Sequence, residues 1–363
     1  MTATRTLDPP ELIGGQILFR MPDPNRELAG VNLVQEIMRP RVGPPFDDNR
    51  DHGMWTLRFP QPQADRMEYM FELIHQDGGT EMITDVTNPL RAPGAFGEKS
   101  AIEFPGYVVP EWFDPTDPAG GSHRETAITS RTLQCELRTV VWSAPGVEDG
   151  EPVPVLIVHD GPEYDAFSRL TLCLDKAVES ARLPSMRAVL VAPVERNQMY
   201  SASAAYSRAL TYEILPTIAA LAPHPHGRSM RVGMGASLGG LATLHAHRTN
   251  PAAFGALFLQ SGSFFRQRYD KQESDFVRFR RISRFMGHVL KAEQWPHPLP
   301  VTMTCGNIEE NLANNRATES ALIRQGYDVS FFENRDGHNW VGWRDALDPH
   351  LIDLLNKTWW ERI

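Results

Sequence analysis

Apolar and polar residues alternate with a period of two in short segments of the first third of the chain. The clearest are residues 54–59 and 67–75, and the pattern resumes at 80–85 after a Gln-Asp-Gly-Gly turn signal. Such alternation predicts half-buried strands, and the turn predicts a hairpin. Residues 31–38 could form another strand, whereas the rest of 1–51 is rich in proline and glycine and is expected to form loops and sheet edges. These elements predict a small β-sandwich of the early-set, immunoglobulin-like kind.

The remainder of the chain has another pattern, in which short apolar runs alternate with longer amphipathic segments. The strand-like runs are residues 132–142, 153–158, 188–194, 230–232, 256–259, 301–304 and 329–332, and the helical segments are 166–179, 205–221, 238–248, 311–325 and 344–360. Strands that alternate with helices predict a doubly wound, mostly parallel sheet with helices on both faces. The predicted class of this part is therefore α/β.

A polar stretch rich in proline and glycine, residues 110–123, separates the two patterns. Its composition is typical of a linker between domains. We therefore expect a β-sandwich domain at 1–115, a linker at 116–124 and an α/β domain at 125–363.

A Gly-x-Ser-x-Gly motif centred on Ser237 lies where a strand pattern meets a helical pattern. This context is typical of a nucleophile elbow, whose sharp turn needs small neighbours such as Gly235 and Gly239. The N–H of Leu238, at the start of the helix, would then face a developing oxyanion. The alternative is a glycine-rich turn without chemistry, which any doubly wound protein can contain.

A serine nucleophile needs a base, and the base needs an orienting acid. Active-site residues of a parallel sheet lie beyond the carboxyl ends of its strands. His338 and Glu309 follow the last two predicted strands, which gives the chain order Ser–Glu–His expected of an α/β-hydrolase. Glu310 and Asp336 remain alternatives for the acid.

Three blocks of sequence, His-Asp-Gly at 159–161, the elbow at 235–240 and Gly-His-Asn-Trp at 337–340, resemble the putative esterase family. That family includes enterochelin (trilactone siderophore) esterases, feruloyl and acetyl-xylan esterases and antigen 85 mycolyltransferases. Arg196 agrees more weakly, and residues 85–89 resemble the end of the β-sandwich that precedes the hydrolase domain in siderophore esterases. The resemblance implies an α/β-hydrolase fold and ester hydrolysis without a metal or another cofactor.

The loop at His159 departs from the family pattern. Relatives with an Asp-Gly loop take the second oxyanion N–H from the next residue, which here is Pro162 and has no N–H. The second donor is then Gly161 or Glu163, or Leu238 acts as a single strong donor. His159 itself would line the site or support the loop.

Candidate substrate contacts come from cationic and aromatic residues. Eight arginines and lysines against three acidic residues give the segment 264–291 a net charge of +5 in a chain of −9. With Arg196, some of these cations could bind an anionic substrate such as a ferric catecholate, and the alternative is a solvated helix face. Tyr164 and Trp340 could stack on an aromatic or sugar group, although Trp340 is equally compatible with the core.

The composition excludes several other classes of function. A net charge of −9 argues against a general nucleic-acid binder, and three widely spaced cysteines indicate neither a disulfide framework nor a zinc site. Residues 1–12 lack the pattern of an export signal, and no apolar run approaches about 20 residues, so we expect a cytoplasmic protein without a membrane span. The expected partner is a small-molecule ester, and the composition allows a homo-oligomer.

The sequence therefore predicts a serine esterase that acts through an acyl-enzyme, foremost an enterochelin-esterase-like siderophore (trilactone) esterase. A carbohydrate esterase of the feruloyl or acetyl type and a mycolyl-type acyltransferase are the enzymatic alternatives. A catalytically silent binding protein of the same fold is the alternative from another class.

Overall fold

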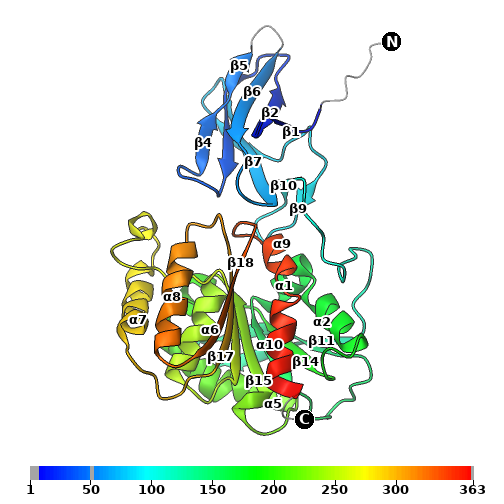
Figure 1. The fold of residues 1–363 in the computed structure, drawn as a ribbon, viewed down its shortest axis with the longest axis vertical. Coiled ribbons are helices and arrows are strands. Elements are labelled where there is room, and N and C mark those ends of the chain that lie inside the picture. The colour runs from blue at the N-terminus through cyan, green and yellow to red at the C-terminus, as the bar shows by residue number, and fades with distance from the viewer. Residues whose placement is uncertain (1–7, 50–52, 361–363) are drawn as a thin grey trace. The chain divides into compact units, whose positions relative to one another are not determined.

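The computed structural model describes residues 8–49 and 53–360 (Figure 1). Contacts divide the chain into two compact units. The β-unit contains the chain up to Val108 together with Gly306–Glu310 and Arg335–Gly342, and the α/β-unit contains Val109–Cys305, Asn311–Asn334 and the chain from Trp343 onward. Two short segments that are distant in sequence from residue 108 thus belong to the β-unit.

The β-unit consists of two sheets whose strand pairs are antiparallel. The first sheet has the strand order β1 (Glu11–Ile13), β2 (Gln16–Pro22), β6 (Met54–Pro60), β5 (Asp47–Asn49). The second sheet has the order β4 (Val42–Pro45), β3 (Leu28–Gln35), β7 (Arg66–His75), β10 (Lys99–Glu103), β9 (Arg91–Ala92). Strand β8 (Thr80–Ile83) also pairs with β7. Alternate side chains of both sheets, among them Phe19 and Phe71, form one buried core. The predicted β-sandwich is confirmed.

In the described part of residues 1–51, the expectation of loops and sheet edges beside one strand is wrong for β2, which lies inside its sheet. This segment contributes β1 to β5, and the strands richest in proline or polar residues, β4 and β5, lie at sheet edges. An edge strand tolerates proline because one side of it makes no ladder hydrogen bonds. Residues 1–7, on which the prediction about an export signal partly rests, lie outside the described residues.

The α/β-unit is built on one eight-stranded sheet. Its order is β11 (Ser122–Ser130), β12 (Cys135–Ser143), β14 (Arg187–Val191), β13 (Val155–His159), β15 (Arg231–Ala236), β16 (Ala256–Gln260), β17 (Pro300–Gly306), β18 (Asp328–Asn334). The pairs from β14 to β17 are parallel, and those of β11 with β12 and β12 with β14 are antiparallel. Every residue of β13, β14 and β16 is buried, as expected for strands covered on both faces.

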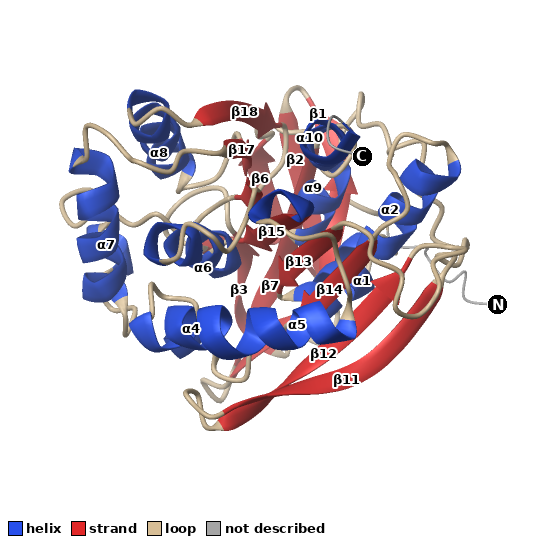
Figure 2. Cartoon of the chain, turned by 90° about the horizontal axis from the view of Figure 1, so that it is seen from below, coloured by secondary structure: helices blue, strands red, loops and turns tan. Residues whose placement is uncertain are grey.

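Helices supply that cover, and α5 and α6 lie on the opposite face of the sheet from α2 and α10 (Figure 2). The helices are α1 (Gly161–Ser168), α2 (Leu170–Glu179), α3 (Arg196–Met199), α4 (Ala204–Ala209), α5 (Leu215–Leu221), α6 (Leu238–Thr249), α7 (Phe279–Lys291), α8 (Leu312–Arg324), α9 (Trp340–Asp345) and α10 (His350–Trp359). This arrangement confirms the predicted α/β class. Within the described residues, no helix combines the length and the apolar character that crossing a bilayer requires.

Some boundaries differ from the predicted ones. The predicted linker 116–124 ends inside β11, which the apolar pattern missed because most of its side chains are exposed. The predicted helix 205–221 contains a π-helical turn, Leu210–Ile214, between α4 and α5. The predicted helix 344–360 is split, and its second part, α10, begins just after Pro349, a residue that cannot continue a preceding helix.

Candidate active site

Ser237 occupies a sharp turn between β15 and α6. Its backbone has φ 56° and ψ −121°, a left-handed conformation that is costly for a residue with a side chain. A Cβ on Gly235 would lie 2.4 Å from the backbone carbon of Gly239, so the turn closes only because residue 235 lacks a side chain. The structure therefore has the strand–turn–helix geometry of a nucleophile elbow at Ser237.

Hydrogen bonds attach this turn to the end of β16. The N–H of Ser237 donates to the carbonyl of Gln260 at 2.9 Å, and the N–H of Ser263 donates to the carbonyl of Ser237 at 3.0 Å. The two hydroxyl groups, Ser237 Oγ and Ser263 Oγ, are 3.1 Å apart. Sequence analysis missed Ser263, although its position after the apolar run 256–259 could have revealed it.

The first turn of α6 begins directly after the serine. No side chain caps this end of the helix, so its first N–H groups can serve an anion. Leu238 carries the first of them, and its side chain is buried. This is the place expected for one oxyanion donor.

The second candidate donor lies in the loop from His159 to Pro162, at the start of α1. Asp160 is buried and left-handed, with φ 54°. A Cβ on Gly161 would lie 2.3 Å from the Cα of Leu190, so only glycine fits there. Pro162 occupies the first turn of the helix and, having no N–H, supplies no donor.

Arg196, the predicted substrate contact, forms an ion pair within the same unit. Its Nη2 lies 2.7 Å and its Nε 2.9 Å from the two carboxylate oxygens of Asp160. The guanidinium thus fixes the residue that precedes Gly161. A direct role toward substrate would use the remaining part of this side chain, which is about one-third exposed (37%).

His159 and Tyr164 lie in the core of the α/β-unit. His159 Nδ1 lies 3.1 Å from the carbonyl of Met234 and 3.0 Å from Thr243 Oγ1, and burial lowers its pKa to about 4. It is therefore neutral at pH 7 and supports the loop. Tyr164 is fully buried and donates to Gln260 Oε1 at 2.9 Å, which leaves no exposed ring face for the predicted stacking.

His338 and Glu309 lie side by side in the β-unit. The distance from His338 Nδ1 to Glu309 Oε2 is 2.8 Å, and the other carboxylate oxygen accepts the N–H of Gly306 at 2.7 Å. Glu309 is almost inaccessible (1%), whereas the His338 side chain is one-third exposed (34%). A buried carboxylate at Nδ1 fixes the orientation of the imidazole ring.

The two alternative acids have other partners. Glu310 accepts hydrogen bonds from the guanidinium groups of Arg39 and Arg41, at 2.8 and 3.3 Å. Asp336 accepts the N–H of Gly337 at 2.7 Å and the side-chain amide of Asn339 at 2.8 Å.

The loops that carry the base and its acid continue directly from strands of the large sheet. β17 ends at Gly306, three residues before Glu309, and β18 ends at Asn334, four residues before His338. Ser237 likewise follows β15 directly. Trp340, the first residue of α9, is half-buried.

The cationic segment divides into paired and exposed residues. Arg281 donates to the carbonyls of Ser201 and Gln198, and Arg266 to Asn314 Oδ1. Other cations are exposed, namely Arg268, Lys271, Arg280, Arg284 and Lys291. Helix α7 buries its apolar face, so its outward arginines fit the solvated-face alternative as well as a substrate role. Over residues 8–49 and 53–360, no three histidine, cysteine or acidic side chains cluster as metal ligands do.

The family model and the relatives that match this chain are those of esterases. A family model described as "Putative esterase" matches residues 130–354. The iron(III) enterobactin esterase of Dickeya dadantii (strain 3937) is 26% identical over 280 residues, which are 72% of this chain and 63% of that relative, so the match spans just under two thirds of its length.

Among solved structures, the enterobactin esterase of Shigella flexneri determined in the presence of enterobactin has a TM-score of 0.75 at 18% identity, over 98% of this chain and 96% of that one. A ferulic acid esterase has a TM-score of 0.55 at 17% identity, over 66% of this chain and 100% of that one. These similarities concern the fold, and they confirm the predicted α/β-hydrolase fold preceded by a β-sandwich.

Proposed function

The chain belongs to the putative esterase family, and on this premise we propose that it cleaves a carboxylic ester through an acyl-enzyme formed on Ser237. His338 is the base, and Glu309 orients it. The observation that carries this proposal is the hydrogen bond of 2.8 Å between His338 Nδ1 and Glu309 Oε2. The loops of these two residues follow β18 and β17, and Ser237 follows β15 of the same sheet.

The proposed reaction has two halves. His338 Nε2 takes the proton of Ser237 Oγ as the oxygen attacks the ester carbonyl, and it returns that proton to the leaving alcohol. Water then attacks the acyl-enzyme with the same base, which releases the acid and regenerates the serine. Glu309 stabilises the imidazolium that forms in each half.

The negative oxygen of the tetrahedral intermediate needs N–H donors, each worth about 3–4 kcal/mol in the transition state. We assign one to Leu238 and the second to Gly161. The assignment of Gly161 is supported by the Asp160–Arg196 ion pair, which fixes the preceding residue, and by Pro162, which cannot donate.

We propose a siderophore trilactone or a similar polyester as the substrate. Support comes from the 26% identity to an iron(III) enterobactin esterase. The fold of an enterobactin esterase also extends over 98% of this chain, whereas that of the ferulic acid esterase extends over 66%. A trilactone carrying a ferric catecholate is anionic, and exposed Arg280 and Arg284 on α7 are candidate contacts with it.

The mechanism is tested by labelling with a fluorophosphonate, which reacts with activated serines. We expect wild type to be labelled, Ser237→Ala to be unlabelled and inactive, and the exposed-serine control Ser274→Ala to match wild type. An unlabelled wild type would instead favour the catalytically silent binding protein.

The substrate is tested with trilactone, feruloyl, acetylated-sugar and p-nitrophenyl esters. We expect the highest kcat/KM for the trilactone and a KM raised several-fold in the Arg280→Gln/Arg284→Gln variant. A preference for a feruloyl or acetyl ester, or transfer of the acyl group to a sugar hydroxyl, would replace the proposed substrate by one of the alternatives. The cytoplasmic location and a homo-oligomeric state stay predictions, which cell fractionation and light scattering would test.

A further inference from the structure

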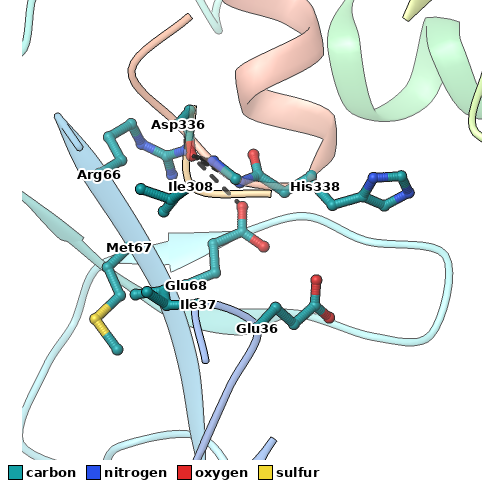
Figure 3. Close-up of a pocket in the computed structure, with 10 residues that line it drawn as sticks. Glu36, Ile37, Arg66, Met67, Glu68, Ile308, Asp336 and His338 are labelled. Atoms are coloured by element: carbon teal, nitrogen blue, oxygen red, sulfur yellow. Dashed lines mark hydrogen bonds and ion pairs between the residues drawn. The ribbon is translucent and has the colours of Figure 1, made fainter. Parts of the chain in front are cut away.

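Arg66 is a buried arginine of the β-unit with no assigned role. It begins strand β7, and its side chain is 3% exposed. Its Nη1 lies 3.2 Å from Asp336 Oδ2 and 3.8 Å from Glu68 Oε1. Figure 3 shows the guanidinium against Asp336, and both residues line a small cavity to which His338 also contributes.

Asp336 organises the loop that carries His338. Its Oδ1 accepts the N–H of Gly337 and the side-chain amide of Asn339, at 2.7 and 2.8 Å. Asn339 in turn accepts the N–H of Gly342 at 2.7 Å. One carboxylate oxygen therefore binds the backbone N–H that precedes His338 and the side-chain amide that follows it, and the other oxygen faces Arg66.

The same aspartate also contacts the loop of the acid. A Cβ on Gly306 would lie 2.2 Å from the carbonyl oxygen of Asp336, so the two loops meet backbone to backbone. Gly306 is the residue whose N–H donates to Glu309 Oε1 at 2.7 Å. A displacement of Asp336 would thus reach both members of the His338–Glu309 pair.

Further contacts of the β-unit flank these loops, but they are more exposed. Arg335 donates to the Asp65 carboxylate at 2.7 Å, and the amide of Asn307 donates to the carbonyl of Gln63 at 2.7 Å. Both of these contacts are exposed to solvent, whereas the Arg66–Asp336 contact is buried. A buried ion pair is screened little by water or salt, and a partner left alone in that site is strongly unfavourable.

We propose that Arg66 is a positioning residue for His338, acting through Asp336, so that the β-unit holds the base–acid pair of the esterase in its reactive geometry. This inference rests on the proposed function, because it gives Arg66 a role only if His338 is the base. Errors near 1 Å in a reacting group can cost about 10²-fold in rate. Losing the Arg66 contact should therefore lower kcat and leave KM nearly unchanged.

The test compares Arg66→Met, Arg66→Lys and the control Arg20→Met by steady-state kinetics on a p-nitrophenyl ester. We expect kcat to fall about 30- to 100-fold in R66M with KM within about threefold of wild type. R66K keeps the charge but not the planar fork, so its kcat should lie between those of R66M and wild type. R20M removes an arginine of the same unit that pairs with Glu11 on β1, and it should match wild type.

A second measurement reports the geometry directly. The proton shared by His338 and Glu309 should give a downfield NMR resonance that is present in wild type and R20M, weakened in R66K and lost in R66M. Recording it in a Ser237→Ala background makes it independent of the nucleophile. If R66M does not fold, Asp336→Asn, which removes the charge but keeps the shape, should show the same loss of kcat and of the resonance.

Wild-type kcat together with an intact resonance in R66M or D336N would overturn the inference. A drop in kcat that R66K does not relieve, with the resonance unchanged, would also overturn it, since the effect would then be structural. If Ser237→Ala and His338→Ala keep wild-type turnover while R66M loses the resonance, the proposed function fails and the positioning of the ring by Arg66 stands.

Discussion

The turn at Ser237 and the loops of His338 and Glu309 are held in different ways. The turn is fixed by main-chain geometry, namely a positive φ, glycines without room for a Cβ, and backbone hydrogen bonds to the end of β16. The loops are fixed by side chains, with Asp336 and Glu309 binding loop N–H groups and Arg66 binding Asp336 from the β-unit. The nucleophile thus depends on local sequence, and the base–acid pair depends on residues far away in the chain.

The largest loss of activity is expected when the proposed acid, Glu309, is replaced. Glu309→Gln keeps the shape but removes the charge that orients the His338 ring, and we expect kcat to fall about 10²- to 10⁴-fold. Glu310→Gln should change kcat less than about threefold, because its pairs with Arg39 and Arg41 are solvent-exposed. Steady-state kinetics of the two variants decides between adjacent carboxylates, and a larger loss in E310Q would reverse the assignment.

A smaller effect is expected in the turn. Gly235→Ala places a Cβ 2.4 Å from the backbone of Gly239, so the elbow must shift, and we expect a loss of activity of about 10²-fold and of stability of about 1–3 kcal/mol. Gly287→Ala on α7 is the matched control, since a Cβ at that position would meet no atom within 4 Å. Kinetics and urea unfolding measure both variants, and equal losses would mean that main-chain closeness does not hold the turn.

An effect on stability alone, without a change in the catalytic groups, is expected from the pH dependence of the β-unit. Burial raises the pKa of Glu68 to about 7 from its ordinary 4.5, so the folded state holds a proton that the unfolded state releases. Stability from this group is present below about pH 4.5 and is lost as the pH rises through 7, by an amount on the order of 3 kcal/mol. The free energy of unfolding of Glu68→Gln minus that of wild type should therefore be more positive at pH 8 than at pH 5, as measured by urea unfolding.

The buried histidines of the α/β-unit act in the opposite direction. Burial lowers the pKa of His159 to about 4, below the 6.5 of the unfolded chain, so its contribution is lost as the pH falls from 6.5 toward 4. The same measurement on His159→Gln should show less loss of stability between pH 7 and 5 than wild type. A pH profile unchanged by either variant would contradict the distinction between the two units.

How much could be predicted from the sequence follows the same division. The elbow at Ser237 and the order of strands and helices are visible because a glycine motif and apolar periodicity act over few residues. The strand-end rule also led to Glu309 and His338, which the structure brings together. It could not choose among Glu309, Glu310 and Asp336, because their partners come from elsewhere in the chain.

Long-range partners explain the other differences. Arg66 and Asp336 are 270 residues apart in sequence, and neither lies in a sequence motif that predicts their contact. Tyr164 was expected to stack on a substrate group, but its hydroxyl donates to Gln260, 96 residues away, in the core. The exposed strand β11 escaped detection because an edge strand with few buried side chains lacks a clear apolar pattern.

The β-unit is built from three separate stretches of chain, and this has a consequence for the design of chimeric proteins. The matched family region, residues 130–354, contains both loops but begins after Asp65 and Arg66 and so excludes them. A chimera that exchanges only this region would combine loops from one parent with anchoring side chains from another. A chimera should therefore keep its activity only when residues 63–66 are exchanged together with both loops. The unit to exchange is defined by these contacts and not by one crossover point in the sequence.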